Sequence, residues 1–166
     1  MGMKPRKPPV PEQERTPLAQ LNEAGAHAIV GYQLAQATIV TDQVFDERVA
    51  GRGGLRRVEF TILALVQGNP GVSARQLARA LAVTPPNVAI WLDRLESRGL
   101  VTRERSTSDA RVQHVQLTRA GTTLVTRTVQ TLLEGEQVAL AALSAAERAM
   151  LVELLHKVAL QRRRTE

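Results

Sequence analysis

The chain has 166 residues, of which 43% are hydrophobic and only 2% aromatic, with no cysteine and a formal net charge of +6. This length fits one domain with an appended dimerisation element, and its core must consist mainly of leucine, valine, isoleucine and alanine side chains. The lack of cysteine excludes disulfides, thiolate zinc sites and thiol redox switches, and no apolar run reaches the roughly 18 residues that a membrane span needs.

The N-terminal part begins with residues 1–17, which contain five of the eight prolines and no apolar segment of the secretory type. We interpret this stretch as a disordered basic tail and expect a cytoplasmic protein. From residue 18 to about 48, apolar residues recur near the helical period and predict a long amphipathic helix. The glycine cluster at residues 51–54 ends this helix.

Three shorter helices are predicted next. The first runs from Leu55 to about residue 67 and stops at the glycine- and proline-containing turn of residues 68–71. Ser73 is a typical N-cap of a short second helix. Thr84 is the N-cap of a third, with Pro85 at the first helical position, and Gly99 supplies its left-handed stop.

A basic hairpin follows the third helix. Its strands are predicted at about residues 100–105 and 112–117, on either side of a polar segment. Residues 98–119 hold five arginines against two acidic residues, which is typical of a face that binds a polyanion. Helix, turn, helix and basic hairpin together can place one helix in a DNA groove and a charged finger beside it.

Two helices complete the chain. Thr118 caps a long helix that runs to about residue 140. Ser144 and Glu147 form the capping box of a last helix. Five apolar residues of this last helix are expected to face inward: Met150, Leu151, Leu154, Leu155 and Val158. A basic tail, residues 162–166, follows.

A set of short motifs runs through residues 73–121: Leu77-Ala78, Val83-Thr84-Pro85, Val88, Asp93-Arg94-Leu95, Gly99-Leu100-Val101, Asp109-Ala110-Arg111 and Leu117-Thr118-Arg119-Ala120-Gly121. Together they resemble the MarR family of bacterial regulators, and the order of helices extends the similarity over residues 18–160. The resemblance implies a mainly α fold with a small β-hairpin. A winged helix-turn-helix lobe, residues 55–119, would be flanked by dimerisation helices at residues 18–50 and 118–161.

The resemblance also implies which residues meet DNA. The helix that opens at Thr84 would enter the major groove and present base-contacting positions: Pro85, Pro86, Asn87, Ala89, Ile90 and Arg94. Asn87 can make a bidentate contact to adenine. The family commonly has arginine at position 90 and threonine or serine at 89, so direct polar readout is weaker here, although both side chains could touch thymine methyl groups. The alternative for Ile90 is that it packs inward.

The hairpin would form the wing. Arg111 resembles the family arginine that enters the minor groove, and Asp109 would hold it in place. The alternative is an ordinary turn aspartate beside a solvated arginine. Arg103 and Arg105 lie on one face of a strand and are assigned to phosphate contacts. The alternative is that this face of the strand is simply solvated. Two more phosphate contacts are assigned before the turn, Ser73 and Gln76, although Ser73 could be a cap alone.

His27, Tyr32 and Phe60 are candidates for an effector pocket, with core or interface packing as the alternative. No histidine spacing suggests a metal, and neither a nucleophile elbow nor a phosphate loop is present, so no metal, cofactor or enzyme activity is predicted.

The leading hypothesis is a homodimeric repressor that binds an inverted repeat in double-stranded DNA and is released by a small aromatic effector. A winged-helix protein-interaction module and a non-specific architectural DNA-binding protein remain as alternatives.

Overall fold

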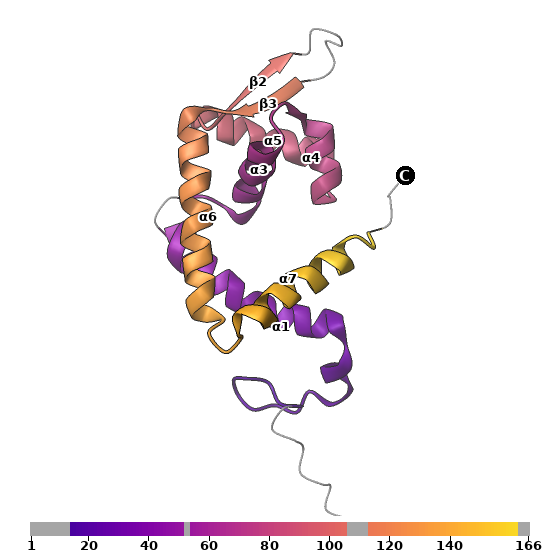
Figure 1. Cartoon of the computed structure of the whole chain (residues 1–166). Coiled ribbons are helices and arrows are strands. Elements are labelled where there is room, and N and C mark those ends of the chain that lie inside the picture. Colours follow the sequence, from indigo (N-terminus) through magenta and orange to yellow (C-terminus); the bar gives the residue numbers. More distant parts are fainter. Residues whose placement is uncertain (1–13, 52–53, 106–112, 163–166) are drawn as a thin grey trace, which may run out of the picture. The chain divides into compact units, whose positions relative to one another are not determined.

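The computed structural model describes residues 14–51, 54–105 and 113–162 (Figure 1). The chain divides into two units, Met1–Gln43 and Val44–Glu166. The architecture is mainly helical with one small antiparallel sheet, as the sequence predicts. Within the described residues, no helix combines the length and hydrophobicity required to cross a membrane.

The first unit differs from the long helix predicted over residues 18–48. Its first part is a loop, closed by a β-bridge between Arg15 and Asn22. Residues 15–17 therefore belong to this ordered loop and not to the predicted disordered tail. The side chains of Thr16 and Asn22 accept hydrogen bonds from backbone N–H groups, at 3.0 Å from Leu21 and 2.7 Å from Ala24. Such side-chain bonds compete with a helical ladder. A 3-10 helix, η2 (Ala24–Ala28), and then α1 (Val30–Phe45) follow this loop.

The second unit contains the remaining elements. A single π-helical turn follows α1, and apart from the short strand β1 the later elements follow in the order that the sequence predicts, with the bounds of the two hairpin strands within one residue. The elements are η3 (Asp46–Ala50), α3 (Arg57–Gly68), β1 (Val72–Ser73), α4 (Ala74–Leu81), α5 (Pro85–Ser97), β2 (Val101–Arg105), β3 (Gln113–Leu117), α6 (Arg119–Ala139) and α7 (Ala145–Ala159). The two-residue β1 is too short to leave a periodic signal in the sequence.

The sheet has the strand order β1-β3-β2. In the hairpin, Val101 pairs with Leu117 and Arg105 with Gln113, and β1 places Val72 opposite Val115. The valines at 101 and 115 are buried, as the alternation of a half-buried strand requires. Figure 1 shows this hairpin lying across one end of the second unit, beside α5.

Three predicted caps are confirmed. The Ser73 hydroxyl accepts from Gln76 N at 3.3 Å, and the Ser144 hydroxyl accepts from Glu147 N at the same distance. Ser144 also donates to the Glu147 carboxylate, and this hydrogen bond lowers the pKa of Glu147. The Thr118 hydroxyl accepts from Gly121 N at 3.0 Å and donates to the Gly99 carbonyl at 2.7 Å. Thr118 therefore connects the end of α5 to the start of α6.

The hydrophobic core of the second unit lies between α3, α4, α5, the sheet and α6, and it consists largely of leucine, isoleucine and valine, as the composition predicts. At the start of α6, a Cβ added to Gly121 would lie 2.0 Å from the Leu100 carbonyl oxygen, so this close approach requires glycine. Among the described residues of this unit, one carboxylate is buried: Glu59 accepts from Arg56 N at 3.0 Å and lies 3.4 Å from Arg98 Nη1.

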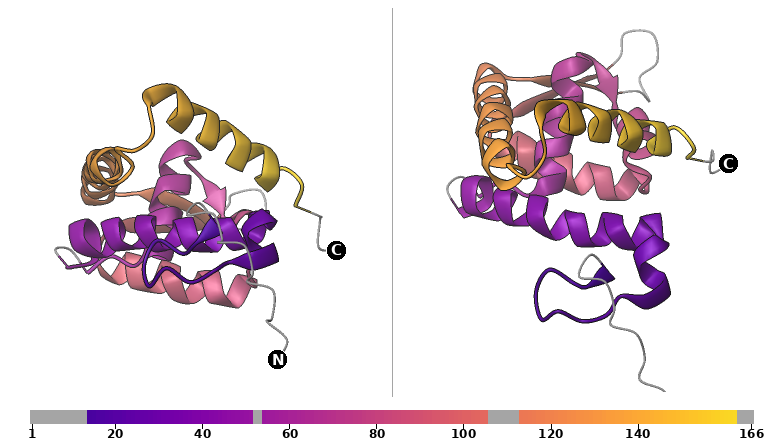
Figure 2. Two further views of the ribbon diagram at one scale, coloured as in Figure 1. Left: turned by 90° about the horizontal axis from the view of Figure 1, so that it is seen from below. Right: turned by 60° about the horizontal axis from the view of Figure 1, so that its bottom comes forward.

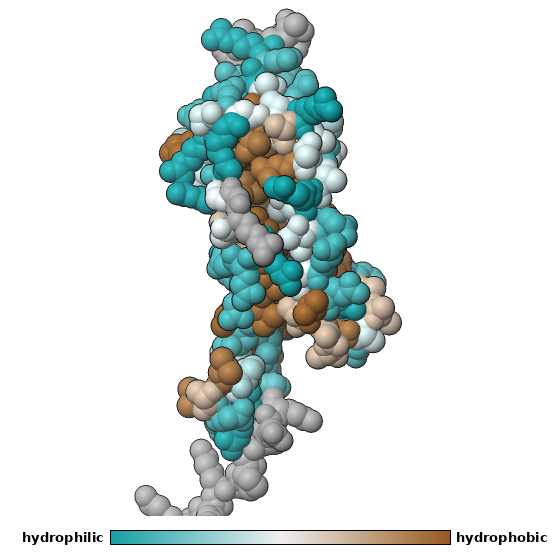
Figure 3. Space-filling model, turned by 90° about the vertical axis from the view of Figure 1, so that its left-hand side faces the viewer, coloured by the Kyte–Doolittle hydropathy of each residue, from teal (hydrophilic) through white to brown (hydrophobic). Residues whose placement is uncertain are grey.

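Helix α7 extends away from the end of α6 after a short turn, which both views of Figure 2 show. The prediction that its apolar stripe faces inward is wrong within one chain, because every residue of α7 but Arg148 is largely exposed. Met150 exposes 55% of its surface and Leu154 48%. None of the described residues of the second unit covers this stripe. Figure 3 shows hydrophobic residues open to solvent between hydrophilic ones on one face of the molecule.

Candidate nucleic-acid interface

Helices α4 and α5 form a helix-turn-helix. Helix α4 ends at Leu81. Its C-cap Ala82 has a left-handed φ of 54°, and Val83 N then bonds to Ala78 O at 3.0 Å. Thr84 stands at the N-cap of α5 as predicted, but its side chain accepts no capping bond. Pro85 and Pro86 at the first two helical positions have no N–H, which leaves the Asn87 N–H as the one donor in reach of the cap. The Thr84 carbonyl accepts from Asn87 N instead, at 3.1 Å.

Helix α5 has one buried and one exposed face. Val88, Leu92 and Leu95 are fully buried in the core, and Trp91 packs partly against it. The positions assigned to DNA lie on the other face and, with one exception, are exposed: Pro85, Pro86, Asn87, Ile90 and Arg94, whereas Ala89 is half-buried. Ile90 exposes 55% of its surface, so the alternative that it packs inward is wrong.

Arg103 connects the hairpin to α5. From β2 its Nε donates to the Glu96 carboxylate at 3.0 Å, its Nη2 makes a second, shorter contact with the same oxygen, and Nη2 also lies 2.8 Å from Asp93 Oδ1. The bond to Glu96 raises the pKa of Arg103. The sequence assigned Arg103 to a phosphate, whereas the structure gives its guanidinium two carboxylate partners on α5. Periodicity along one strand could not reveal partners on another element.

The rest of the predicted wing is only partly described. Arg105 is exposed at the end of β2, where it pairs with Gln113 in the ladder. Asp109 and Arg111, the predicted brace and minor-groove residue, lie outside the described residues.

Helix α4 contributes a second basic surface. Ser73 and Gln76 are both present at its start, but Gln76 Oε1 accepts from the Ser73 N–H and hydroxyl at 2.9 and 2.8 Å, so the two side chains bind each other. Arg75 and Arg79 lie one turn apart on α4 and are exposed, and the helix contains no acidic residue. Sequence reasoning missed this pair, although two arginines at i and i+4 without a nearby carboxylate were a usable signal.

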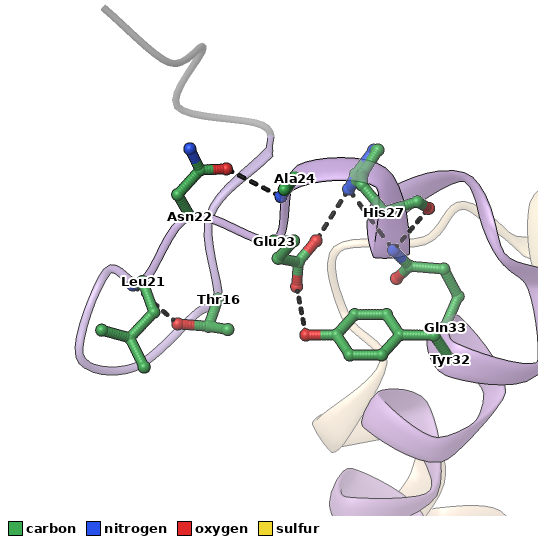
Figure 4. A network of polar contacts seen from close by, with 8 residues as sticks. All are labelled: Thr16, Leu21, Asn22, Glu23, Ala24, His27, Tyr32 and Gln33. Carbon is green, nitrogen blue, oxygen red and sulfur yellow. Dashed lines mark hydrogen bonds and ion pairs between the residues drawn. The ribbon is translucent and has the colours of Figure 1, made fainter.

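A polar cluster in the first unit contains two of the three candidate effector residues (Figure 4). The Glu23 side chain, only 4% exposed, lies 2.7 Å from His27 Nδ1 and accepts from the Tyr32 hydroxyl at 3.2 Å. The bond to His27 lowers the pKa of Glu23, and desolvation, with the bond to Glu23, raises the pKa of Tyr32. Sequence reasoning missed Glu23, the centre of this cluster.

The third candidate, Phe60, belongs to the second unit and packs against Phe45, with ring centroids 6.1 Å apart. Among the described residues, no group of three or more histidine, cysteine or acidic side chains could hold a metal ion.

The chain is similar in sequence and in fold to known proteins. The MarR family profile matches residues 55–112, a range that contains α3, α4, α5 and β2. The HTH-type transcriptional regulator PecS of Dickeya dadantii is 32% identical over 128 residues, which cover 75% of this chain and 76% of PecS. Among solved structures, the transcriptional repressor CouR bound to a 23-mer DNA duplex is 30% identical, with a TM-score of 0.76. That match covers 85% of this chain and 99% of CouR.

BpsR of Bordetella bronchiseptica, whose structure concerns the regulation of DNA binding by 6-hydroxynicotinic acid, is 26% identical. Its TM-score is 0.69, and the match covers 78% of this chain and 92% of BpsR. The similarity to these proteins extends over α4, α5 and the β2–β3 hairpin, which form a winged helix-turn-helix of the DNA-binding type. The chain therefore belongs to the MarR family of transcriptional regulators.

Proposed function

We propose that the chain is a homodimeric repressor that binds an inverted repeat in double-stranded DNA. One observation carries this proposal: Arg103 holds the hairpin against α5, so that the exposed face of the helix and the basic strand belong to one rigid element. A helix in the major groove and a hairpin beside it can then engage DNA together. The similarity to CouR, which was solved on a DNA duplex, supports this arrangement.

The contacts would divide into positioning and readout. Arg75, Arg79 and Arg105 are exposed cations at the two ends of the helix-turn-helix surface and are suited to phosphates. Asn87 would pair with adenine, and Arg94 would reach the backbone beside it. Arg111 would enter the minor groove with Asp109 as its brace, and the Ser73–Gln76 pair would approach a phosphate.

The dimer would form through the apolar stripe of α7, with a second copy of this chain as its occupant. Leu133 and Val138 on α6 add exposed apolar surface, at 58% and 69%, close to the turn from which α7 begins. An uncovered stripe on an otherwise regular helix is typical of a subunit interface. A two-fold dimer presents two identical α5 helices, and this symmetry requires an inverted repeat.

A small aromatic molecule would release the DNA, as the regulation of BpsR by 6-hydroxynicotinic acid suggests by analogy. Tyr32 and His27 of the first unit supply a ring and polar atoms for such a ligand. Phe60, which packs against Phe45 in the second unit, is a separate candidate. Binding of such a ligand can shift the protein between two states only if it prefers one of them.

A competition gel shift tests the proposal. The full chain should shift duplex DNA from the region upstream of its own gene, and random DNA should compete at least about a thousandfold more weakly. Equal competition by random DNA would support an architectural protein instead. No specific shift at moderate salt would support the protein-interaction module.

A further inference from the structure

The exposed tip of α5 is apolar apart from Asn87. Pro85 and Pro86 occupy the first two helical positions and are exposed. Ile90, one turn after Pro86, exposes 55% of its surface, although isoleucine is among the most often buried residue types. Because proline has no N–H, the start of α5 also lacks two of the donors that a helix N-terminus usually offers to a phosphate.

Charge is absent from this tip as well. The first eight residues of α5 contain no charged side chain, and the charges begin at Asp93. Arg103 binds both Asp93 and Glu96 and offsets part of their negative charge further along the helix. Arg94 is the exposed cation of α5, and it lies a full turn beyond Ile90. Guanine is most often read by a bidentate arginine or lysine, and the tip has neither.

We infer that Ile90 is a specificity-determining residue that packs against the C5-methyl group of thymine in the major groove. The inference rests on the proposed function. The thymine methyl is the apolar group that base pairs present in that groove, and contact with an exposed isoleucine removes apolar surface from water on both sides. Asn87, one turn before Ile90 and also exposed, pairs with adenine at a neighbouring position. The half-site is therefore an A·T-containing sequence in which a methyl group carries part of the specificity.

The test uses the full chain and a duplex selected from a random library. In the selected duplex, uracil replaces thymine at one position at a time in both half-sites, which removes only the methyl group. Affinities are measured for the natural chain, for Ile90→Ala and, as a matched control on the same DNA-facing surface, for Arg79→Gln. Trp91, the only tryptophan of the chain, reports thermal unfolding of the same helix in each variant.

One buried methyl group is worth about fourfold in affinity, so uracil at the critical position in both half-sites should weaken binding by the natural chain about fifteenfold. The Ile90→Ala variant should bind the thymine duplex about as weakly as the natural chain binds the uracil duplex. Replacing thymine by uracil should change the affinity of this variant less than twofold. Arg79→Gln should retain the full sensitivity to uracil. The inference is overturned if no uracil substitution weakens the natural chain, or if Ile90→Ala keeps the same sensitivity, as it would were Ile90 to dock a protein. A selection that enriches no sequence refutes the proposed function itself.

Discussion

Arg103 on β2 donates a hydrogen bond to the carboxylate of Glu96 on α5, with Nε and Oε2 3.0 Å apart. The same guanidinium lies 2.8 Å from Asp93, so one arginine joins the hairpin to two consecutive turns of the helix. The Arg103 side chain is 21% exposed and that of Glu96 39% exposed. Solvent therefore screens the pair, and its main effect is expected on the orientation of the wing rather than on the stability of the fold.

Arg103→Gln tests this role. We expect the free energy of unfolding to fall by no more than about 1 kcal/mol, because the ion pair is partly solvated. DNA binding should weaken about tenfold, or about 1.4 kcal/mol, since the wing loses its fixed orientation. The slope of log K against log salt should stay unchanged, because the Arg103 guanidinium is bound by Glu96 and Asp93 and therefore does not contact a phosphate.

Arg105→Gln is the matched control on the same strand. Its exposed guanidinium is suited to a phosphate, so this variant should lower the salt slope by about one unit. If Arg103→Gln lowers the slope by the same amount, Arg103 contacts a phosphate in the complex and the positioning role is wrong.

Gly121→Ala should destabilise the second unit by at least about 2 kcal/mol, because the added Cβ would meet the Leu100 backbone oxygen at 2.0 Å and backbone cannot move aside cheaply. Urea unfolding monitored by Trp91 fluorescence measures the loss. The control is Gly68→Ala, at the end of α3, where nothing lies within 4 Å of the added atom. That variant should be neutral or up to about 1 kcal/mol more stable. Equal effects of the two substitutions would contradict the packing argument.

The polar cluster of the first unit predicts a dependence on pH. His27 holds the pKa of Glu23 below its ordinary value of 4.5, so ionised Glu23 stabilises the folded loop above that pH. The contribution is lost as the pH falls through the lower pKa of the folded state. Tyr32, the only tyrosine, bonds to this carboxylate, and its ring resonances should therefore shift below pH 4.5.

Glu23→Gln should abolish that shift in the Tyr32 resonances, because the side chain no longer titrates. Glu47→Gln, which changes an exposed carboxylate of the other unit, should leave the shift intact. A Tyr32 titration that persists in Glu23→Gln would assign the effect to another group.

Leu154→Glu should convert the proposed dimer to a monomer, because it places a charge in the middle of the apolar stripe of α7. Val152→Glu is the control: Val152 is 68% exposed and lies on a different face of the same helix. Sedimentation at several protein concentrations distinguishes the two variants. Dimers of equal stability in both would place the subunit interface elsewhere.

Local chemistry made most of the second unit predictable. Ser73, Thr118 and Ser144 begin helices because their hydroxyls accept backbone N–H groups, and Gly99 ends one because its φ of 66° suits glycine. The same local signals failed over residues 18–29. There, hydrogen bonds of Thr16 and Asn22 with nearby backbone outweighed an apolar spacing that looked helical.

The sequence by itself determined the family and most of the order of helices and strands, because caps, turns and periodicity act between residues close along the chain. It left open whether Ile90 of α5 packs inward. Only the tertiary structure decided the partners of Arg103, the central position of Glu23 and the exposure of the α7 stripe. Each of these depends on groups brought together from different elements. A strand pattern shows that two arginines share a face, but only the packing of β2 against α5 shows that one of them is bound by carboxylates.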